Sequence, residues 1–307
     1  MEEKIYTTET GNLSYVIKKN GITIKKYRGI GTKMVIPETI EGLSVVAIEK
    51  KAFLSCKTLR EIVLPDTIQE IGDWAFAHAE QLRTITVPNH EFTRGKELFL
   101  GCKRLREIAL SGSSEQQEAD KEDGIQRMLA AAVTVLHDYF LFDPLEVRSD
   151  SWVKRWDEQL IKLIELDDLD GFEELWTCGE EDYEGKDYDI KSYPVEKRKL
   201  KLRMVYFRLL HPFKLSETVC LQLQQYLREH TKNTQEPEAW DILLEEHPQD
   251  ILYYRAFTDA GCVNEENFDD ILADMQEVNP EIKAYMLRYQ EEHLKKKDAF
   301  ASFELDW

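Results

Sequence analysis

The fold of this chain is decided by a repeated stretch that first reads CKTLREIVLP, over residues 56–65. After an interval of 23 residues, residues 79–88 read AEQLRTITVP, and after the same interval residues 102–111 read CKRLREIALS. The interval also relates Phe53, Phe76 and Phe99. Each unit is too short to bury its own apolar face, whereas stacked units bury it against one another. The period therefore predicts a solenoid of 23-residue repeats.

Each repeat carries the signals of one short strand and a return of the chain. The residues from Ile62 to Leu64 are expected to alternate inward and outward, as a strand requires. Pro65 follows at a point where no ladder donor is needed. In the returning half, Gly72 is expected to allow a tight turn, and Phe76 to fill the interior.

The full pattern, I-P-x-x-I…I-x-x-x-A-F-x-x-C-x-x-L-x-x-I-x-L-P, resembles the BspA-like bacterial leucine-rich repeats over about residues 12–111. The resemblance implies a curved sheet that binds other macromolecules, and many members of the family are surface proteins. The third unit departs from the pattern, because Arg94-Gly95 replaces the Ile-Gly turn and Ser111 replaces the last proline. Both departures suit a terminal repeat that ends the solenoid.

Helical periodicity replaces the strand pattern in the second half of the chain. Residues 112–123 are polar and lack aromatic side chains, which is typical of a linker or mobile loop. Beyond them, stripes such as Trp152, Trp156, Leu160 and Leu163 recur at helical spacing. We therefore predict an α+β protein. Its parts are a leucine-rich-repeat domain with an N-terminal hairpin cap over residues 1–111, a polar linker over 112–123, and an acidic all-helical array over 124–307.

Charge and hydropathy narrow the choice of partner and location. Residues 1–110 hold 17 Lys and Arg against 14 Asp and Glu, and the remaining residues hold 23 against 45. An acidic half repels phosphate backbones, so we expect no nucleic acid. No apolar run approaches the roughly 20 residues of a membrane-spanning helix, so we expect no membrane. The first residues, MEEKIYTTET, lack the apolar segment of a secretory signal. This predicts a cytoplasmic protein if Met1 is the native start, and a secreted or surface protein if a signal was removed.

The sequence contains no motif that indicates catalysis, a cofactor or a metal site. It contains no HExxH, no pair of histidines four residues apart, no CxxC, no GxSxG and no glycine-rich phosphate loop. The five cysteines are odd in number and widely spaced, which favours buried free thiols over disulfides or zinc. The acidic stretch 180–189 is interpreted as solvated surface. The apolar tail 298–307 is interpreted as packed on its own domain, with packing on a partner as the alternative. We expect no catalytic residue, no cofactor and no metal site.

The candidate binding surface lies on the repeated strands. Arg60, Arg83 and Arg106 occupy equivalent positions in successive units, and stacked strands lie roughly 4.8 Å apart, so the three form a column. One interpretation is an arginine ladder for an acidic partner. Another is a solvated edge whose arginines pair locally with glutamates, and a third is docking on the acidic half of the same chain. The strand residues expected to complete the surface are Glu61, Thr84 and Glu107, followed by Val63, Thr86 and Ala109.

These observations favour a non-catalytic protein-protein interaction or scaffold protein that binds a protein partner through the strand face. The partner's identity and the oligomeric state do not follow from the sequence. Two alternatives remain open. One is an enzyme with an unrecognised site in the helical domain, which predicts a pocket with convergent polar groups. The other is a purely structural or self-associating protein, which predicts a strand face that is covered.

Overall fold

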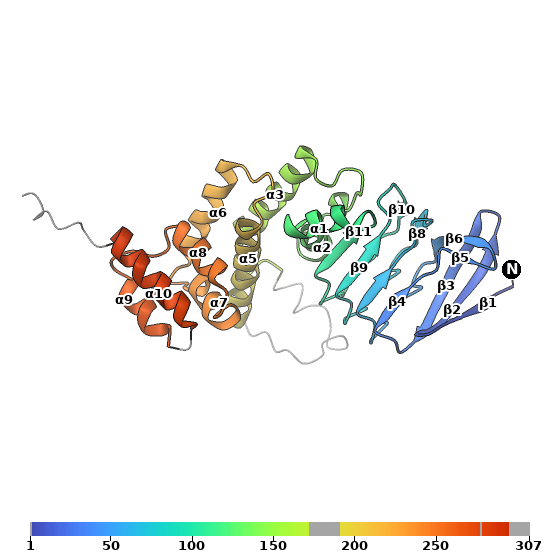
Figure 1. The fold of residues 1–307 in the computed structure, drawn as a ribbon, viewed down its shortest axis with the longest axis horizontal. Helices are drawn as coiled ribbons and strands as arrows, with labels where there is room; N and C mark the ends of the chain where they lie inside the picture. The colour runs from blue at the N-terminus through green and yellow to red at the C-terminus, as the bar shows by residue number, and fades with distance from the viewer. Residues whose placement is uncertain (1, 172–190, 277, 295–307) are drawn as a thin grey trace, which may run out of the picture. The chain divides into compact units, whose positions relative to one another are not determined.

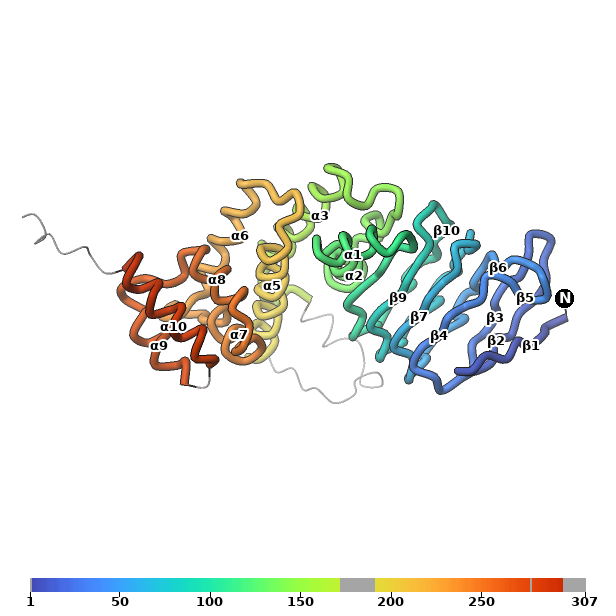
Figure 2. The backbone as a smooth tube through the Cα atoms, in the orientation of Figure 1, coloured from blue at the N-terminus to red at the C-terminus, as the bar shows by residue number. Residues whose placement is uncertain are grey.

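The chain divides into two compact units, Met1–Gln159 and Leu160–Trp307, which are described separately below. The computed structural model describes residues 2–171, 191–276 and 278–294 (Figures 1 and 2). The acidic stretch 180–189, Cys178 and the apolar tail 298–307 lie outside the described residues.

The first unit is a solenoid with two sheets. One sheet begins as an antiparallel meander and continues with parallel strands in the order β1-β2-β3-β6-β8-β10, with β5 paired to β6. The other sheet is parallel throughout, in the order β11-β9-β7-β4. The strands are β1 (Lys4–Thr8), β2 (Gly11–Lys18), β3 (Gly21–Gly29), β4 (Lys33–Val35), β5 (Thr39–Ile40), β6 (Leu43–Ile48), β7 (Glu61–Val63), β8 (Glu70–Ile71), β9 (Thr84–Val87), β10 (Thr93–Arg94) and β11 (Glu107–Leu110).

The register of the parallel sheet confirms the 23-residue repeat. Ile62 lies opposite Ile85, and Ile85 lies opposite Ile108. All three side chains are fully buried. The equivalent positions therefore stack in columns, and the columns that point inward form one continuous core through the repeats.

An aromatic column runs through that core. The rings of Tyr27, Phe53, Phe76 and Phe99 stack in succession, with centroids 5.5, 5.5 and 5.7 Å apart. Phe142 meets the last ring edge-on at 5.8 Å and ends the column. Such offset and edge-on pairs stabilise a core beyond the area that they bury.

Gly72 serves close packing of the turns rather than the turn conformation that we expected. A Cβ atom at Gly72 would lie 2.5 Å from the backbone nitrogen of Lys50, and one at Gly95 would lie 2.3 Å from that of Asp73. Neither glycine has a positive φ. The lack of a side chain thus lets successive turns approach each other at backbone distance.

The predicted loop at 112–123 is wrong, because most of this segment is helix α1 (Ser114–Glu122). The Ser113 side chain caps the helix by accepting a hydrogen bond from the backbone N–H of Gln116. Helix α2 (Ile125–Thr134) follows and packs on β11 with buried Ile125, Met128 and Leu129. These helices and the 3₁₀ turn η1 (Tyr139–Leu141) belong to the same unit as the repeats. We call residues 113–149 the helical cap.

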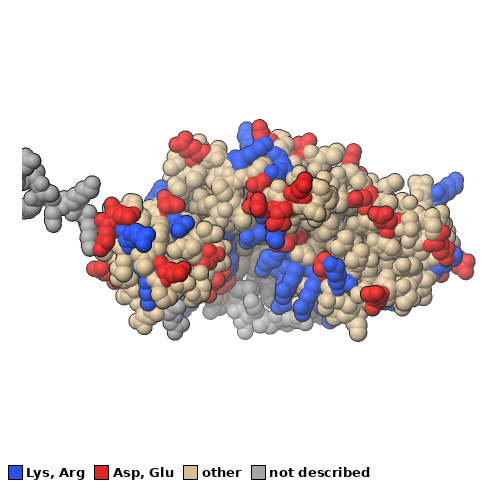
Figure 3. Space-filling model, viewed as in Figure 1, with Lys and Arg blue, Asp and Glu red and all other residues tan. Residues whose placement is uncertain are grey.

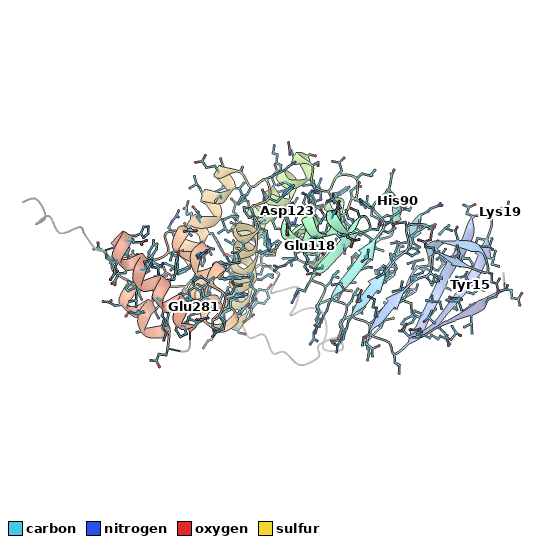
Figure 4. The ribbon with its side chains drawn as sticks, in the orientation of Figure 1. Tyr15, Lys19, His90, Glu118, Asp123 and Glu281 are labelled. Carbon is cyan, nitrogen blue, oxygen red and sulfur yellow. The ribbon has the colours of Figure 1, made fainter. Side chains whose placement is uncertain are left out.

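Ion pairs and indole hydrogen bonds hold the helical cap together. Arg148 contacts Asp120 and Asp123 at 2.6 Å each (Asp123 is labelled in Figure 4). Arg94 lies opposite Ile71 in the register and contacts Asp143 of the cap at 3.4 Å. Trp156, in helix α3 (Asp150–Glu165), donates to the Met128 carbonyl at 3.0 Å. The replacement of isoleucine by Arg94 thus belongs to the end of the solenoid, as expected.

The second unit is helical in its described parts, which confirms the predicted fold class. Trp240 packs against Tyr254 and Phe257 in its core, with ring centroids 6.0 and 5.5 Å apart. The segments are α5 (Ser192–Leu210), α6 (Glu217–Glu229), α7 (Glu238–Glu246), α8 (Ile251–Asp259), α9 (Phe268–Asp274), α10 (Pro280–Tyr289) and the π-helical turn η2 (Gln290–Leu294). The boundary between the two units falls within α3, later in the chain than the predicted linker.

Candidate partner-binding surface

The outward side chains of the parallel sheet form two rows across the strands. The first row pairs Glu61 with Thr84 and Thr84 with Glu107, and the second pairs Val63 with Thr86 and Thr86 with Ala109. All of these predicted surface residues are half-buried, as expected for outward side chains flanked by neighbouring strands. Short and β-branched side chains make the second row flat.

Strand β4 extends both rows by one position, with residues that the predicted surface did not include. Lys33 lies opposite Glu61, and Val35 lies opposite Val63. Val35 is 53% exposed, so it adds apolar surface to the second row. We call the eight outward residues of the two rows the strand face: Lys33, Glu61, Thr84, Glu107, Val35, Val63, Thr86 and Ala109. The signal was present in the sequence, because Met34-Val35-Ile36-Pro37 matches the strand ending Ile62-Val63-Leu64-Pro65.

The arginine column exists as predicted in its backbone geometry. The backbone N–H of Arg83 donates to the carbonyl of Arg60, and that of Arg106 donates to the carbonyl of Arg83, both at 2.8 Å. The three residues are exposed at the starts of β7, β9 and β11. The main chain therefore fixes the three side-chain origins at the spacing of adjacent strands, roughly 4.8 Å.

Local pairing does not neutralise this column. Glu61, the acid next to Arg60, instead contacts the Lys33 ammonium at 2.6 Å. Among the described residues, Arg60, Arg83 and Arg106 form no ion pair with a carboxylate and no side-chain hydrogen bond. The interpretation of a column paired to its neighbouring glutamates therefore fails for Glu61.

Further basic side chains lie just before the arginines in the repeats. Lys57 and Lys103 occupy equivalent exposed positions, and between them the second repeat carries the acid Glu80. Figure 3 shows basic side chains gathered over the starts of β9 and β11. We call the set Lys57, Arg60, Arg83, Lys103 and Arg106 the basic edge. Its charge runs along one side of the strand face.

A cluster of ion pairs in the helical unit surrounds Arg198 of α5. Its guanidinium contacts Asp168 and Glu238 at 2.8 Å each and Glu236 at 3.1 Å. The buried Lys201 contacts Asp168 at 2.6 Å. Burial opposes the charge of Asp168, but hydrogen bonds from Lys201 and Arg198 outweigh it and lower the pKa of that carboxyl. These charges pair with one another, as in a structural ion network.

The remaining features that could bind a ligand are a groove on the first sheet and the cysteine thiols. A groove of about 290 Å³ runs over the outer side of β6, β8 and β10, with Glu49, Lys50, Glu70 and Asp73 along it. Within the described ranges, no group of three His, Cys, Asp or Glu side chains is arranged to hold a metal ion. Cys56, Cys102, Cys220 and Cys262 are free thiols, and burial raises the pKa of Cys102 to about 12.

Parallel strands that stack at a constant interval around a phenylalanine column define a leucine-rich-repeat solenoid. The family model described as "BspA type Leucine rich repeat region" matches residues 32–120 in six copies. Residues 32–120 are therefore a BspA-type leucine-rich-repeat region. The matched model describes a repeat and not a catalytic domain, and the helical remainder of the chain lies outside it.

Solved structures of bacterial leucine-rich-repeat proteins resemble this part of the chain. A leucine rich cell surface protein from Faecalibacterium prausnitzii is 18% identical, with a TM-score of 0.27, and the match covers 36% of this chain and 44% of that one. The leucine rich repeat protein of T. pallidum is 25% identical, with a TM-score of 0.28, covering 36% and 65%. One from Bacteroides ovatus is 24% identical, with a TM-score of 0.27, covering 34% and 28%.

The chain thus matches less than two thirds of each of these structures. A comparison with curated proteins found no match. Among the helices that the structure describes, none is both long and apolar enough to span a bilayer. The cytoplasmic location stays a prediction.

Proposed function

We propose that this protein is a non-catalytic binding protein whose strand face contacts a protein partner. The observation that carries the proposal is the regular outward face of β4, β7, β9 and β11, which combines exposed Val35 with a row of short, half-buried side chains. Solenoids present such extended faces because each repeat adds one strand at a fixed rotation.

The chemistry of the strand face suits protein recognition. Its second row, from Val35 to Ala109, is apolar or small, and its first row carries charges of both signs at Lys33, Glu61 and Glu107. An apolar strip beside polar groups is the usual composition of a specific interface. In the flat second row of valine, threonine and alanine, no imidazole or carboxylate accompanies the Thr86 hydroxyl, whereas catalysis places such groups together.

The experiment is affinity capture from the lysate of the native cell. The face variant carries Thr86→Trp and Ala109→Trp, which place large rings on the second row without changing charge. The control variant carries Thr93→Trp, at an exposed position of β10 in the other sheet. All three proteins are first compared for folding and size by circular dichroism and light scattering.

We expect the wild type and the control to capture the same protein, and the face variant to lose at least about 90% of it, since steric blocking of an interface centre costs well over 1.4 kcal/mol. Equal capture by all three proteins would remove the strand face as the binding surface. A face variant that changes from dimer to monomer would instead favour the self-associating alternative.

A further inference from the structure

We infer that the basic edge recognises an acidic segment of the protein partner, laid across the starts of the strands. This inference rests on the proposed function, because it assigns chemistry to the border of the same binding surface. It goes further in naming which side chains of the partner are recognised, namely carboxylates.

The first argument is the unbalanced charge of the basic edge. The backbone hydrogen bonds at 2.8 Å hold Arg60, Arg83 and Arg106 in adjacent strands. Like charges that are held on adjacent strands repel each other. Within the described part of the chain, no carboxylate pairs with these arginines, and the neighbouring Glu61 contacts Lys33 instead. A partner that supplies carboxylates would relieve the repulsion.

The second argument concerns the kind of cation. Equivalent positions in the three repeats all carry arginine, whose planar guanidinium binds a carboxylate through two parallel hydrogen bonds. Lys57 and Lys103 add mobile charge beside that column. A row of guanidinium groups with fixed origins suits a partner that presents several carboxylates in line.

The third argument explains why an acidic protein segment fits the basic edge better than a nucleic acid or a sulfated polymer does. Glu80, Glu61 and Glu107 lie next to the basic edge, the last two on the strands themselves. A nucleic acid or sulfated polymer carries its charges on a stiff backbone and meets these acids unfavourably, whereas a flexible polypeptide can turn its carboxylates away from them. A protein segment can alternate acidic with neutral or basic side chains, and can place apolar residues over Val63 and Thr86, roughly 10 Å along the strands.

The test measures binding of fluorescein-labelled poly-L-glutamate by anisotropy in 0.1 M salt, where the screening length is about 10 Å and distant acids of the chain contribute little. The edge variant carries Arg60→Gln, Arg83→Gln and Arg106→Gln. The matched control carries Lys19→Gln, Lys50→Gln and Lys96→Gln, which remove the same charge from exposed positions outside the edge. A labelled DNA oligonucleotide serves as the competing polyanion.

We expect the edge variant to bind poly-L-glutamate roughly tenfold more weakly than the wild type and the control, as the loss of three exposed pairs implies. The midpoint of thermal unfolding of the edge variant should equal or exceed that of the wild type, because removing repulsion does not destabilise the free protein. Equal binding by both variants, no binding by the wild type, a destabilised edge variant, or tighter binding of DNA than of poly-L-glutamate would each overturn the inference.

The lysate capture distinguishes this inference from the proposed function. If the edge variant retains the partner that the face variant loses, the strand face is the binding surface and the acidic segment is not recognised. If the face variant retains the partner while the edge variant loses poly-L-glutamate binding, the proposed function fails and the basic edge stands as a separate site.

Discussion

At the scale of single residues, His90 links two successive turns of the solenoid. Its Nδ1 lies 2.8 Å from the carbonyl oxygen of Glu91, and its Nε2 lies 2.7 Å from that of Asp66 (His90 is labelled in Figure 4). Both acceptors can be satisfied only if both ring nitrogens carry protons. The hydrogen bonds to Glu91 and Asp66 therefore raise the pKa of His90.

The raised pKa predicts a pH-dependent contribution to stability. Protonated His90 is favoured in the folded state, so its contribution is fully present below the unfolded pKa, about 6.5, and is lost as the pH rises through the folded pKa. We expect His90→Gln to lower the free energy of unfolding by up to about 1 kcal/mol at pH 5.5, and by less at pH 8. Urea unfolding of both proteins across this range measures the difference. A loss that is constant with pH, or that grows at high pH, would contradict the assignment.

The residues of the binding surface show which features the repeat could predict and which it could not. The positions of Arg60, Arg83 and Arg106 followed from the 23-residue interval, because equivalent residues of a solenoid must stack. The partner of Glu61 did not follow. Its ion pair with Lys33 depends on the register of β4, and the interval before that repeat is 28 residues from Pro37 to Pro65. The longer interval did not show that Lys33 would lie opposite Glu61.

At the scale of elements, the phenylalanine column joins the repeats into one core. The ring of Phe76 lies between those of Phe53 and Phe99, at 5.5 and 5.7 Å, and its side chain is fully buried. Phe76→Ala should lower the free energy of unfolding by about 3–5 kcal/mol, through lost burial and the cavity left behind. Phe76→Leu keeps much of the volume and should cost distinctly less. Chemical denaturation of both variants is the measurement, and a cost below about 1 kcal/mol for alanine would show that the column is not a main source of stability.

Helix α1 shows why an element with a clear local signal escaped prediction. Ser113 and Gln116 have the spacing of a capping box, and the Ser113 hydroxyl does accept from the Gln116 backbone N–H at 3.2 Å. The helix is nevertheless polar nearly throughout, and Asp120 is its buried residue. Its tertiary anchors are ionic, through Arg148, and such anchors leave no apolar stripe for a periodicity argument to detect.

At the scale of the whole molecule, the first unit extends as far as the helices that pack on the last strand of the solenoid. Residues after 111 were assigned to a separate helical domain because their periodicity differs from that of the repeats. The spacing of apolar residues predicts whether a segment is a helix or a strand, but not which surface it packs against. Helix α2 packs on β11, and Phe142 contacts both Phe92 and Phe99. The helical cap is therefore part of the repeat unit.

This packing predicts that the repeats do not fold without the helical cap. A fragment of residues 1–111 would expose the surface covered by Ile125, Met128, Leu129 and Phe142, all of which are buried. Burial of each such side chain contributes about 1.5–3 kcal/mol, so their combined loss is comparable to the 5–15 kcal/mol that typically stabilises a domain. We expect residues 1–159 to unfold cooperatively on heating, and residues 1–111 to aggregate or to show no cooperative transition. Circular dichroism and size-exclusion chromatography compare the fragments with the full chain. If residues 1–111 unfolded cooperatively within a few degrees of residues 1–159, the solenoid would close itself, and the predicted boundary at residue 111 would be the physical one.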